Sequence, residues 1–236
     1  MYKFCINAGH GINKAGKRCL KSLDPKQTRE WTLNSRIVEK IIKGLEERYT
    51  GFEYLRLDDP TGKRDIPLKE RTDKANKFGA NDYYSIHHNA GILGGKGGGI
   101  VVYTYTKVDK STADLQKALY DKLIEKTGLK GNRSKPLGKA NFHECRESNM
   151  PAVLGELGFM DSKTDTPIIL TEEYATKCAE AYIEVIAERG KLTKKEVKPT
   201  TNTKLYRVQV GAYSDKANAE KTVAELKADG YDAIIV

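Results

Sequence analysis

Three short apolar segments, each ending in a side chain that can bind a metal or move a proton, constrain the fold of this sequence most. They are Tyr2–Ile6 before His10, Tyr83–Ile86 before His87, and Ala152–Gly155 before Glu156. Short apolar runs bounded by turn residues are typical of buried parallel strands. In open α/β sheets, functional side chains gather where the carboxyl ends of such strands meet. We therefore expect an α/β fold with a twisted, mostly parallel sheet flanked by helices.

Helical patterns alternate with these segments. Apolar residues recur three and four positions apart from Trp31 to Leu45, after Pro67, from Ser111 to Lys126 and from Glu172 to Arg189. This spacing predicts helices with one buried face, and Gly79 and Gly128 are suitable helix ends. The segment Gly94–Gly99 lacks the Gly-Lys-Ser/Thr of a phosphate loop, so we interpret it as a flexible loop at the rim of a site.

Composition limits the class of partner. The 236 residues carry a formal net charge of +9, which predicts affinity for a polyanion, either nucleic acid or an anionic cell-wall polymer. No helix-turn-helix, zinc-finger or aromatic-basic strand motif is present, so nucleic acid is not expected. A mean hydropathy of −0.60 and the absence of an apolar stretch near the roughly 20 residues of a membrane helix predict no membrane span.

The cysteines and the first residues indicate where the chain is made. Cys5, Cys19, Cys145 and Cys178 are widely spaced, without paired metal-type spacing, and are expected to be free thiols. Lys3 interrupts the apolar start, so the sequence has no signal-peptide pattern. We expect synthesis in the cytoplasm.

A zinc hydrolase needs three protein ligands, an open position for water and a nearby base. His10, Glu30 and His87 are candidate ligands, and Glu156 is the candidate base. Glu30 opens a helix, where a carboxylate equally well complements the helix dipole. The histidines do not form a helical His-Glu-x-x-His motif, so spacing alone leaves open that they are ordinary core or surface residues. Glu156 lies among apolar residues, which favours a raised pKa, although a solvated strand-end glutamate is the alternative.

The remaining histidines have weaker assignments. His88 is expected on the strand face opposite His87, because side chains alternate along a strand. His143 lies in a polar segment, where it either supports the metal site or substrate or simply bonds to backbone or water.

The C-terminal part differs in composition from the rest. Residues 191–204 are rich in Lys, Thr and Glu and predict a linker. Residues 205–236 then predict a strand, a helix over 218–227 and a second strand. A single β-α-β unit is too small to bury its own faces, so this pattern requires a partner.

Several short motifs in one order resemble the zinc-dependent N-acetylmuramoyl-L-alanine amidases of autolysins and phage endolysins. They are Asn7–Gly11, Glu30, Arg71 with Ala75-Asn76, Ser85–Asn89 and Pro151–Phe159. The resemblance covers roughly residues 1–189 and implies a catalytic domain at 1–190. It also implies that His10, Glu30 and His87 hold one Zn²⁺ and that Glu156 is the catalytic base. His88 stands where this family commonly has a small or apolar residue, and the long loop before Glu30 makes that alignment the weakest.

Residues 206–236 resemble half of a sporulation-related (SPOR) peptidoglycan-binding domain. The resemblance implies binding to peptidoglycan. That family uses two such halves, so either the second half lies beyond the sequence given or two chains pair their halves in a homodimer. Anionic wall polymers are the polyanion that fits this setting.

The resemblance implies hydrolysis of the amide between N-acetylmuramic acid and L-alanine. Two other functions stay open at this point: a zinc peptidase acting on the stem peptide and a non-catalytic wall-binding protein. Without an export signal, the protein is expected to reach the wall after host lysis or mother-cell lysis, as an endolysin or a sporulation-type autolysin.

Overall fold

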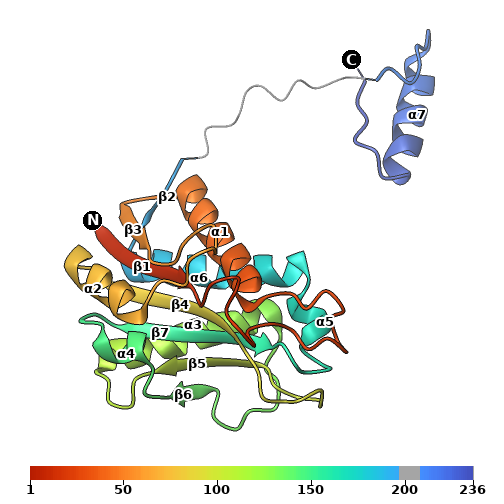
Figure 1. Cartoon of the computed structure of the whole chain (residues 1–236). Coiled ribbons are helices and arrows are strands. Elements are labelled where there is room, and N and C mark those ends of the chain that lie inside the picture. Colours follow the sequence, from red (N-terminus) through yellow and green to blue (C-terminus); the bar gives the residue numbers. More distant parts are fainter. Residues whose placement is uncertain (197–207, 236) are drawn as a thin grey trace. The chain divides into compact units, whose positions relative to one another are not determined.

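The computed structural model describes residues 1–196 and 208–235, which belong to two compact units, Met1–Lys195 and Glu196–Val236. The first unit contains a six-stranded sheet in the order β3-β1-β4-β7-β5-β6 (Figure 1). Its strands are β1 (Tyr2–Ala8), β3 (Phe52–Arg56), β4 (Asp82–Asn89), β5 (Ile100–Thr104), β6 (Leu137–Lys139) and β7 (Ala152–Phe159). β3, β1, β4 and β7 are parallel, whereas β5 and β6 run the opposite way. The predicted mostly parallel α/β sheet is confirmed.

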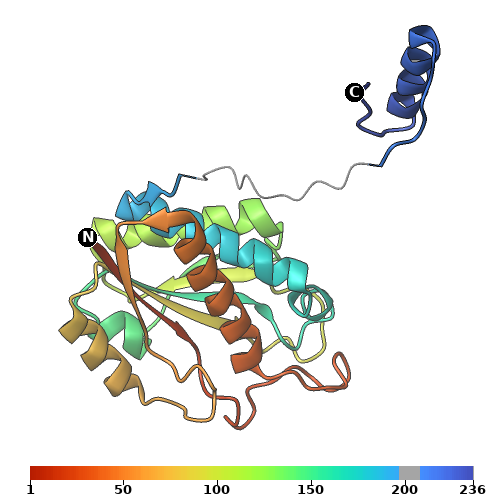
Figure 2. The same cartoon turned by 90° about the horizontal axis from the view of Figure 1, so that it is seen from above.

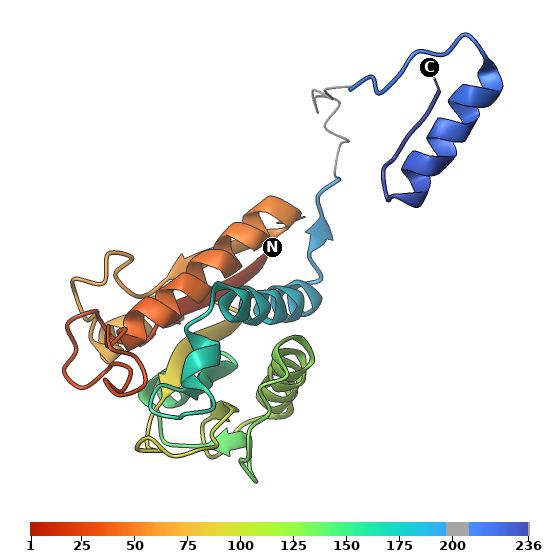
Figure 3. The same cartoon turned by 90° about the vertical axis from the view of Figure 1, so that its right-hand side faces the viewer.

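Three long helices cover one face of this sheet: α1 (Glu30–Arg48), α3 (Lys110–Thr127) and α6 (Glu172–Gly190). α6 packs against both α1 and α3 (Figure 3). On the other face, α2 (Leu68–Phe78) contacts the short α4 (His143–Glu147), as Figure 2 shows from above. α2 and α3 end at Gly79 and Gly128 in the left-handed region, as predicted. The first unit also contains α5 (Thr166–Ile169) and an antiparallel pair, β2 (Tyr49–Thr50) and β8 (Thr193–Lys194).

The two sheet faces bury different amounts of apolar surface. The larger core lies under α1, α3 and α6 and includes Tyr84 and Ile86 of β4. The smaller core lies toward α2 and includes Tyr83 of β4 and Ala75 of α2. Because side chains alternate along β4, His87 lies on the α2 face and His88 on the α1 face, as predicted.

The glycine-rich segment differs from its prediction. Residues 94–99 were expected to form a flexible loop. Instead, polar side chains of Asn132 and of residues after β7 accept hydrogen bonds from the backbone amides of this segment. Gly97 N–H donates to Thr164 Oγ1 (3.1 Å), Gly98 N–H to Asn132 Oδ1 (2.9 Å) and Gly99 N–H to Asp165 Oδ2 (2.7 Å). The four cysteines are free thiols, as expected.

In the second unit, α7 (Lys216–Ala228) begins after Asp215, whose side chain accepts a hydrogen bond from Ala217 N–H (2.7 Å). The two predicted strands beside this helix are not formed over their described parts, 208–211 and 231–235. A strand requires a hydrogen-bonded neighbour, and the described residues of this unit supply none. The rest of the predicted strands, 205–207 and Val236, and the predicted linker residues 197–204 lie outside the described residues.

The first unit continues past residue 190, because β8 pairs with β2 and Lys195 N–H donates to Arg48 O (2.8 Å). Across residues 1–196 and 208–235, no helix combines the length and apolar character needed to cross a membrane.

Candidate metal centre and catalytic cleft

His10, Glu30 and His87 come together although they are far apart in the sequence. One ligand-type atom from each lies within 4.8 Å of the others. His87 Nδ1 is 3.1 Å from Glu30 Oε1, and His10 Nε2 is 3.4 Å from the same oxygen. The two imidazole rings are perpendicular, with centroids 5.0 Å apart. Two imidazoles and one carboxylate converging in this way form a donor set suited to zinc.

Each of the three side chains is placed by a different element. His87 lies on β4, Glu30 is the first residue of α1, and His10 follows β1 with a left-handed φ of 65°. Gly9 N–H donates to Ile86 O (2.8 Å), which brings the end of β1 against β4. A Cβ atom at Gly9 would lie 2.1 Å from His87 Cε1, so only glycine allows this close approach.

Both the N–H and the carbonyl group of Ala8, the residue before Gly9, form hydrogen bonds with buried side chains. Ala8 N–H donates to Asp58 Oδ1 (3.0 Å), and Arg71 Nη1 donates to Ala8 O (3.3 Å). The Arg56 guanidinium in turn binds both carboxylate oxygens of Asp58. Charge-assisted hydrogen bonds from buried groups are stronger than neutral ones, so this arrangement restrains the chain immediately before His10.

Glu156 lies beside His87, because the two residues are directly paired in the register of β4 and β7. Its side chain is partly exposed to the cleft, yet its Oε2 atom is buried and without a hydrogen-bond partner. Burial raises the pKa of Glu156 to about 7. A carboxyl group with such a pKa can accept and release a proton near neutral pH.

The pKa of Glu30 is shifted in the opposite direction to that of Glu156. Burial opposes ionisation of Glu30, but hydrogen bonds from His10 and His87 keep its pKa below the ordinary value. Glu30 Oε2 and His87 Nε2 are nevertheless buried without hydrogen-bond partners, and Lys17 Nζ approaches Glu30 Oε2 only to 3.6 Å. Buried polar atoms without a hydrogen bond are costly unless a further group, such as a cation, binds them.

The site opens into a cleft of about 700 Å³ on the α2 face of the sheet. Ile66, Pro67 and Leu68 form an apolar wall, and α4 forms another wall with its neighbours Asn141 and Phe142. Its remaining lining residues are mostly charged: His10, Lys14, Lys17, Asp65, Arg71, His87, His143, Glu144, Arg146, Leu154 and Glu156. A cleft of this size, with mixed walls and a concentrated group of titratable residues, is a typical substrate site.

The other two histidines lie outside the ligand set. His143 lines the cleft, and its Nε2 is 3.2 Å from Thr72 Oγ1. His88 is buried on the opposite face, with Nδ1 2.7 Å from Asn34 Oδ1, and burial lowers its pKa to about 3. His88 is therefore neutral at ordinary pH.

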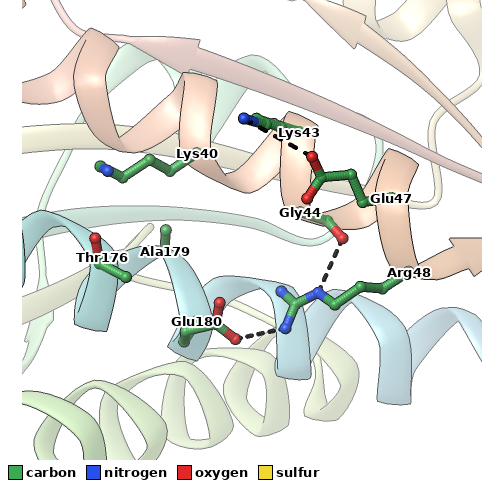
Figure 4. A pocket seen from close by; sticks show the side chains of 8 residues that line it. All are labelled: Lys40, Lys43, Gly44, Glu47, Arg48, Thr176, Ala179 and Glu180. Atoms are coloured by element: carbon green, nitrogen blue, oxygen red, sulfur yellow. Dashed lines mark hydrogen bonds and ion pairs between the residues drawn. The ribbon is translucent and has the colours of Figure 1, made fainter. Parts of the chain in front are cut away.

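A second, smaller groove of about 280 Å³ lies between α1 and α6 (Figure 4). Its charged side chains are largely satisfied by each other: Arg48 Nη1 is 2.8 Å from Glu180 Oε2, and Arg48 Nε donates to Gly44 O (3.0 Å). The groove contains none of the residues predicted for the metal site, so it is not a candidate catalytic site.

Sequence reasoning missed three buried side chains around the centre: Asn34, Asp58 and Glu144. Asp58 directly follows the alternating segment Glu53–Leu57, but the sequence from Asp58 to Gly62 is typical of a turn. Asn34 lies one helical turn after Glu30, and only the contacts across the fold show its importance. Glu144 is 4% exposed and lines the cleft from α4.

Comparisons with known proteins identify the family. A family model described as N-acetylmuramoyl-L-alanine amidase matches residues 4–188, and a SPOR domain model matches residues 176–236. The chain is 31% identical over 236 residues to a sporulation-specific N-acetylmuramoyl-L-alanine amidase of Bacillus subtilis (strain 168), covering 100% of this chain and 85% of the relative. It is 32% identical over 207 residues to an endolysin of Bacillus phage SPP1, covering 83% and 72%.

Solved structures show the same fold. An N-acetylmuramoyl-L-alanine amidase from Clostridium difficile 630 superposes with a TM-score of 0.70 at 27% identity, covering 79% of this chain and 95% of that one.

Proposed function

Because the chain belongs to the N-acetylmuramoyl-L-alanine amidase family, we propose that it cleaves the amide between N-acetylmuramic acid and L-alanine in peptidoglycan, with zinc bound by His10, Glu30 and His87. The observation that carries the proposal is the convergence of these three side chains beside Glu156 at one edge of the sheet.

The residues present suit one zinc ion. The family is generally zinc-dependent, and the donor set here is two imidazoles and one carboxylate. Three protein ligands leave a position for water or substrate, which separates catalytic zinc sites from structural ones. When bound, zinc acts as a Lewis acid that activates water and polarises the amide carbonyl.

In this proposal Glu156 moves the proton. Its carboxylate accepts a proton from the attacking water and delivers it to the leaving nitrogen of L-alanine. The raised pKa supports both steps, because the group is a usable base and, once protonated, a usable acid near neutral pH. The apolar wall at Ile66–Leu68 and the cations Lys14 and Arg146 then bind and orient the glycopeptide in the cleft.

The second unit supplies a wall-binding function in this proposal, since the SPOR model matches it. Its apolar side chains Val208, Val210, Tyr231 and Ile234 are each more than half exposed. We propose that two chains pair these half repeats in a homodimer, and that the net charge of +9 attracts the protein to anionic wall polymers. Sedimentation equilibrium tests the pairing: a single monomeric species at high concentration contradicts it.

Digestion of purified peptidoglycan tests the reaction. An amidase produces a free lactyl carboxylate on muramic acid and a new amino terminus on L-alanine, both identified by mass spectrometry of the products. Cleavage within the stem peptide instead indicates a zinc peptidase. Binding without any product, in protein shown to contain zinc, indicates a non-catalytic wall-binding protein.

A further inference from the structure

Asn34 is a fully buried side chain on α1 that contacts two other elements of the first unit. Its Nδ2 donates to the backbone carbonyl of Gly9 (3.3 Å), and its Oδ1 lies 2.7 Å from His88 Nδ1. Since Asn34 Nδ2 is the donor to Gly9, Oδ1 is the acceptor, and the hydrogen on the His88 ring lies on Nδ1. One carboxamide therefore joins the end of β1, the start of α1 and the end of β4.

Each of these contacts adjoins a proposed zinc ligand. Gly9 immediately precedes His10, and His88 immediately follows His87. Asn34 is four residues after Glu30, which places it one helical turn along α1. A third hydrogen bond connects the same segments, because His88 N–H donates to Glu30 Oε1 (3.3 Å).

We infer that Asn34 is a positioning residue that, together with His88, fixes the three ligand-bearing segments relative to one another and so sets the affinity for zinc. The inference rests on the proposed zinc site. Groups that orient metal ligands typically contribute 10- to 100-fold to metal affinity. Asn34 acts on main-chain segments beside the ligands, so its loss loosens all three ligands together.

Substitutions can separate the two hydrogen bonds from side-chain volume. Asn34→Leu keeps a similar shape but removes both bonds. His88→Phe keeps a ring without the donor, whereas His88→Asn places an amide nitrogen near the position of Nδ1. We expect zinc affinity to fall about 10- to 100-fold in Asn34→Leu, to fall in His88→Phe, and to recover most of the wild-type value in His88→Asn.

Gln116 provides the matched control. It is another buried carboxamide that bridges main-chain segments, donating to Val102 O (2.7 Å) and Gly138 O (2.7 Å) between β5 and β6. It contacts none of the ligand-bearing segments. Gln116→Leu is therefore expected to lower the Tm of the zinc-free protein while leaving the zinc dissociation constant unchanged.

The experiment measures zinc dissociation constants of the full chain by competition with a chromophoric chelator, together with the Tm of each zinc-free variant. The d–d absorption spectrum of the Co²⁺-substituted protein reports ligand geometry independently of activity. Weakened zinc binding and an altered Co²⁺ spectrum in Asn34→Leu and His88→Phe, with rescue in His88→Asn, support the inference. A lowered Tm with wild-type zinc affinity and spectrum overturns it and leaves Asn34 a purely structural residue.

Wild type and His10→Ala are measured alongside these variants. If wild type binds no zinc, or His10→Ala binds it equally well, the proposed zinc site itself is wrong. If wild type binds one zinc that His10→Ala loses, but Asn34→Leu and His88→Phe bind as wild type, only the positioning role is wrong. If Asn34→Leu does not fold, the zinc affinities of His88→Phe and His88→Asn test the positioning role instead.

Discussion

The two compact units of this chain bury their apolar residues to very different extents. In Met1–Lys195, strands and helices share a continuous core, and side chains such as Ile41 and Tyr182 are fully buried. In the second unit, α7 has no buried residue, and Val208 and Ile234 are 85% and 67% exposed. The described residues of this unit, 208–235, share no buried core, so they gain little free energy of folding from burial.

This difference explains where the chemistry lies. A metal site needs side chains held within a fraction of an ångström, which requires rigid, well-packed elements. The sheet and α1 of the first unit provide them. A unit that binds the cell wall does not need side chains held this precisely before binding, because it can become ordered when it binds its partner.

Glu156→Gln is expected to lower the rate of peptidoglycan hydrolysis by about 10²- to 10⁴-fold, since it removes the proposed base. Zinc content and sedimentation with purified cell walls are expected to stay unchanged. Release of soluble muropeptides, metal analysis and wall pull-down measure the three quantities. Retained turnover would rule out Glu156 as the base, and lost wall binding would contradict the separation of the two functions.

Truncation of one apolar side chain in each unit compares their stability directly. Ile41→Ala is expected to lower the free energy of unfolding by about 2–5 kcal/mol, because it leaves a cavity in the main core. At low protein concentration, where the chains are unpaired, Ile234→Ala is expected to change it by less than about 0.5 kcal/mol, because this side chain is exposed. Calorimetry of the full chain at low and high concentration measures both. A large, concentration-dependent effect of Ile234→Ala would show that the exposed side chain is buried between chains.

Removal of residues 196–236 is expected to weaken binding to intact walls by about tenfold or more, because the second attachment point is lost. Hydrolysis of a short soluble muropeptide is expected to continue at the wild-type rate, since the cleft lies within the first unit. Co-sedimentation and a soluble-substrate assay measure the two effects. A comparable loss in both assays would indicate that the second unit takes part in catalysis.

The pH dependence of kcat/KM is expected to show an acid limb. A general base must be ionised, so activity falls as the pH decreases through the pKa of Glu156. Burial places that pKa at about 7, and the positive charge of a bound zinc ion lowers it, so the midpoint lies between the ordinary value of 4.5 and about 7. A profile that rises as the pH decreases through this range would contradict the assigned role.

Local patterns were sufficient to predict most of the first unit. Apolar runs ending at His10, His87 and Glu156 indicated adjacent strand ends. The structure adds the register, which pairs His87 with Glu156. Glu30 depended on the family resemblance, because a carboxylate at a helix start has an ordinary electrostatic explanation.

What the sequence did not predict depends on contacts between distant segments. Asn34 is an unremarked polar residue within a helical pattern until the fold brings Gly9 and His88 to it. The glycine-rich segment appeared flexible because the side chains that bind its amides, such as Asp165, come much later in the chain. The strands predicted beside α7 show the converse: alternation indicates which residues can form a strand, but pairing requires a neighbour.

The pairing of His87 with Glu156 has a consequence for heat inactivation. Their backbones are neighbours in a parallel ladder, so their separation is set by the inter-strand spacing of about 4.8 Å and changes only when the ladder opens. The distance between the proposed base and the proposed ligand His87 therefore survives up to the temperature at which the central strands separate. Heat should break this pair only together with the cooperative unfolding of the sheet.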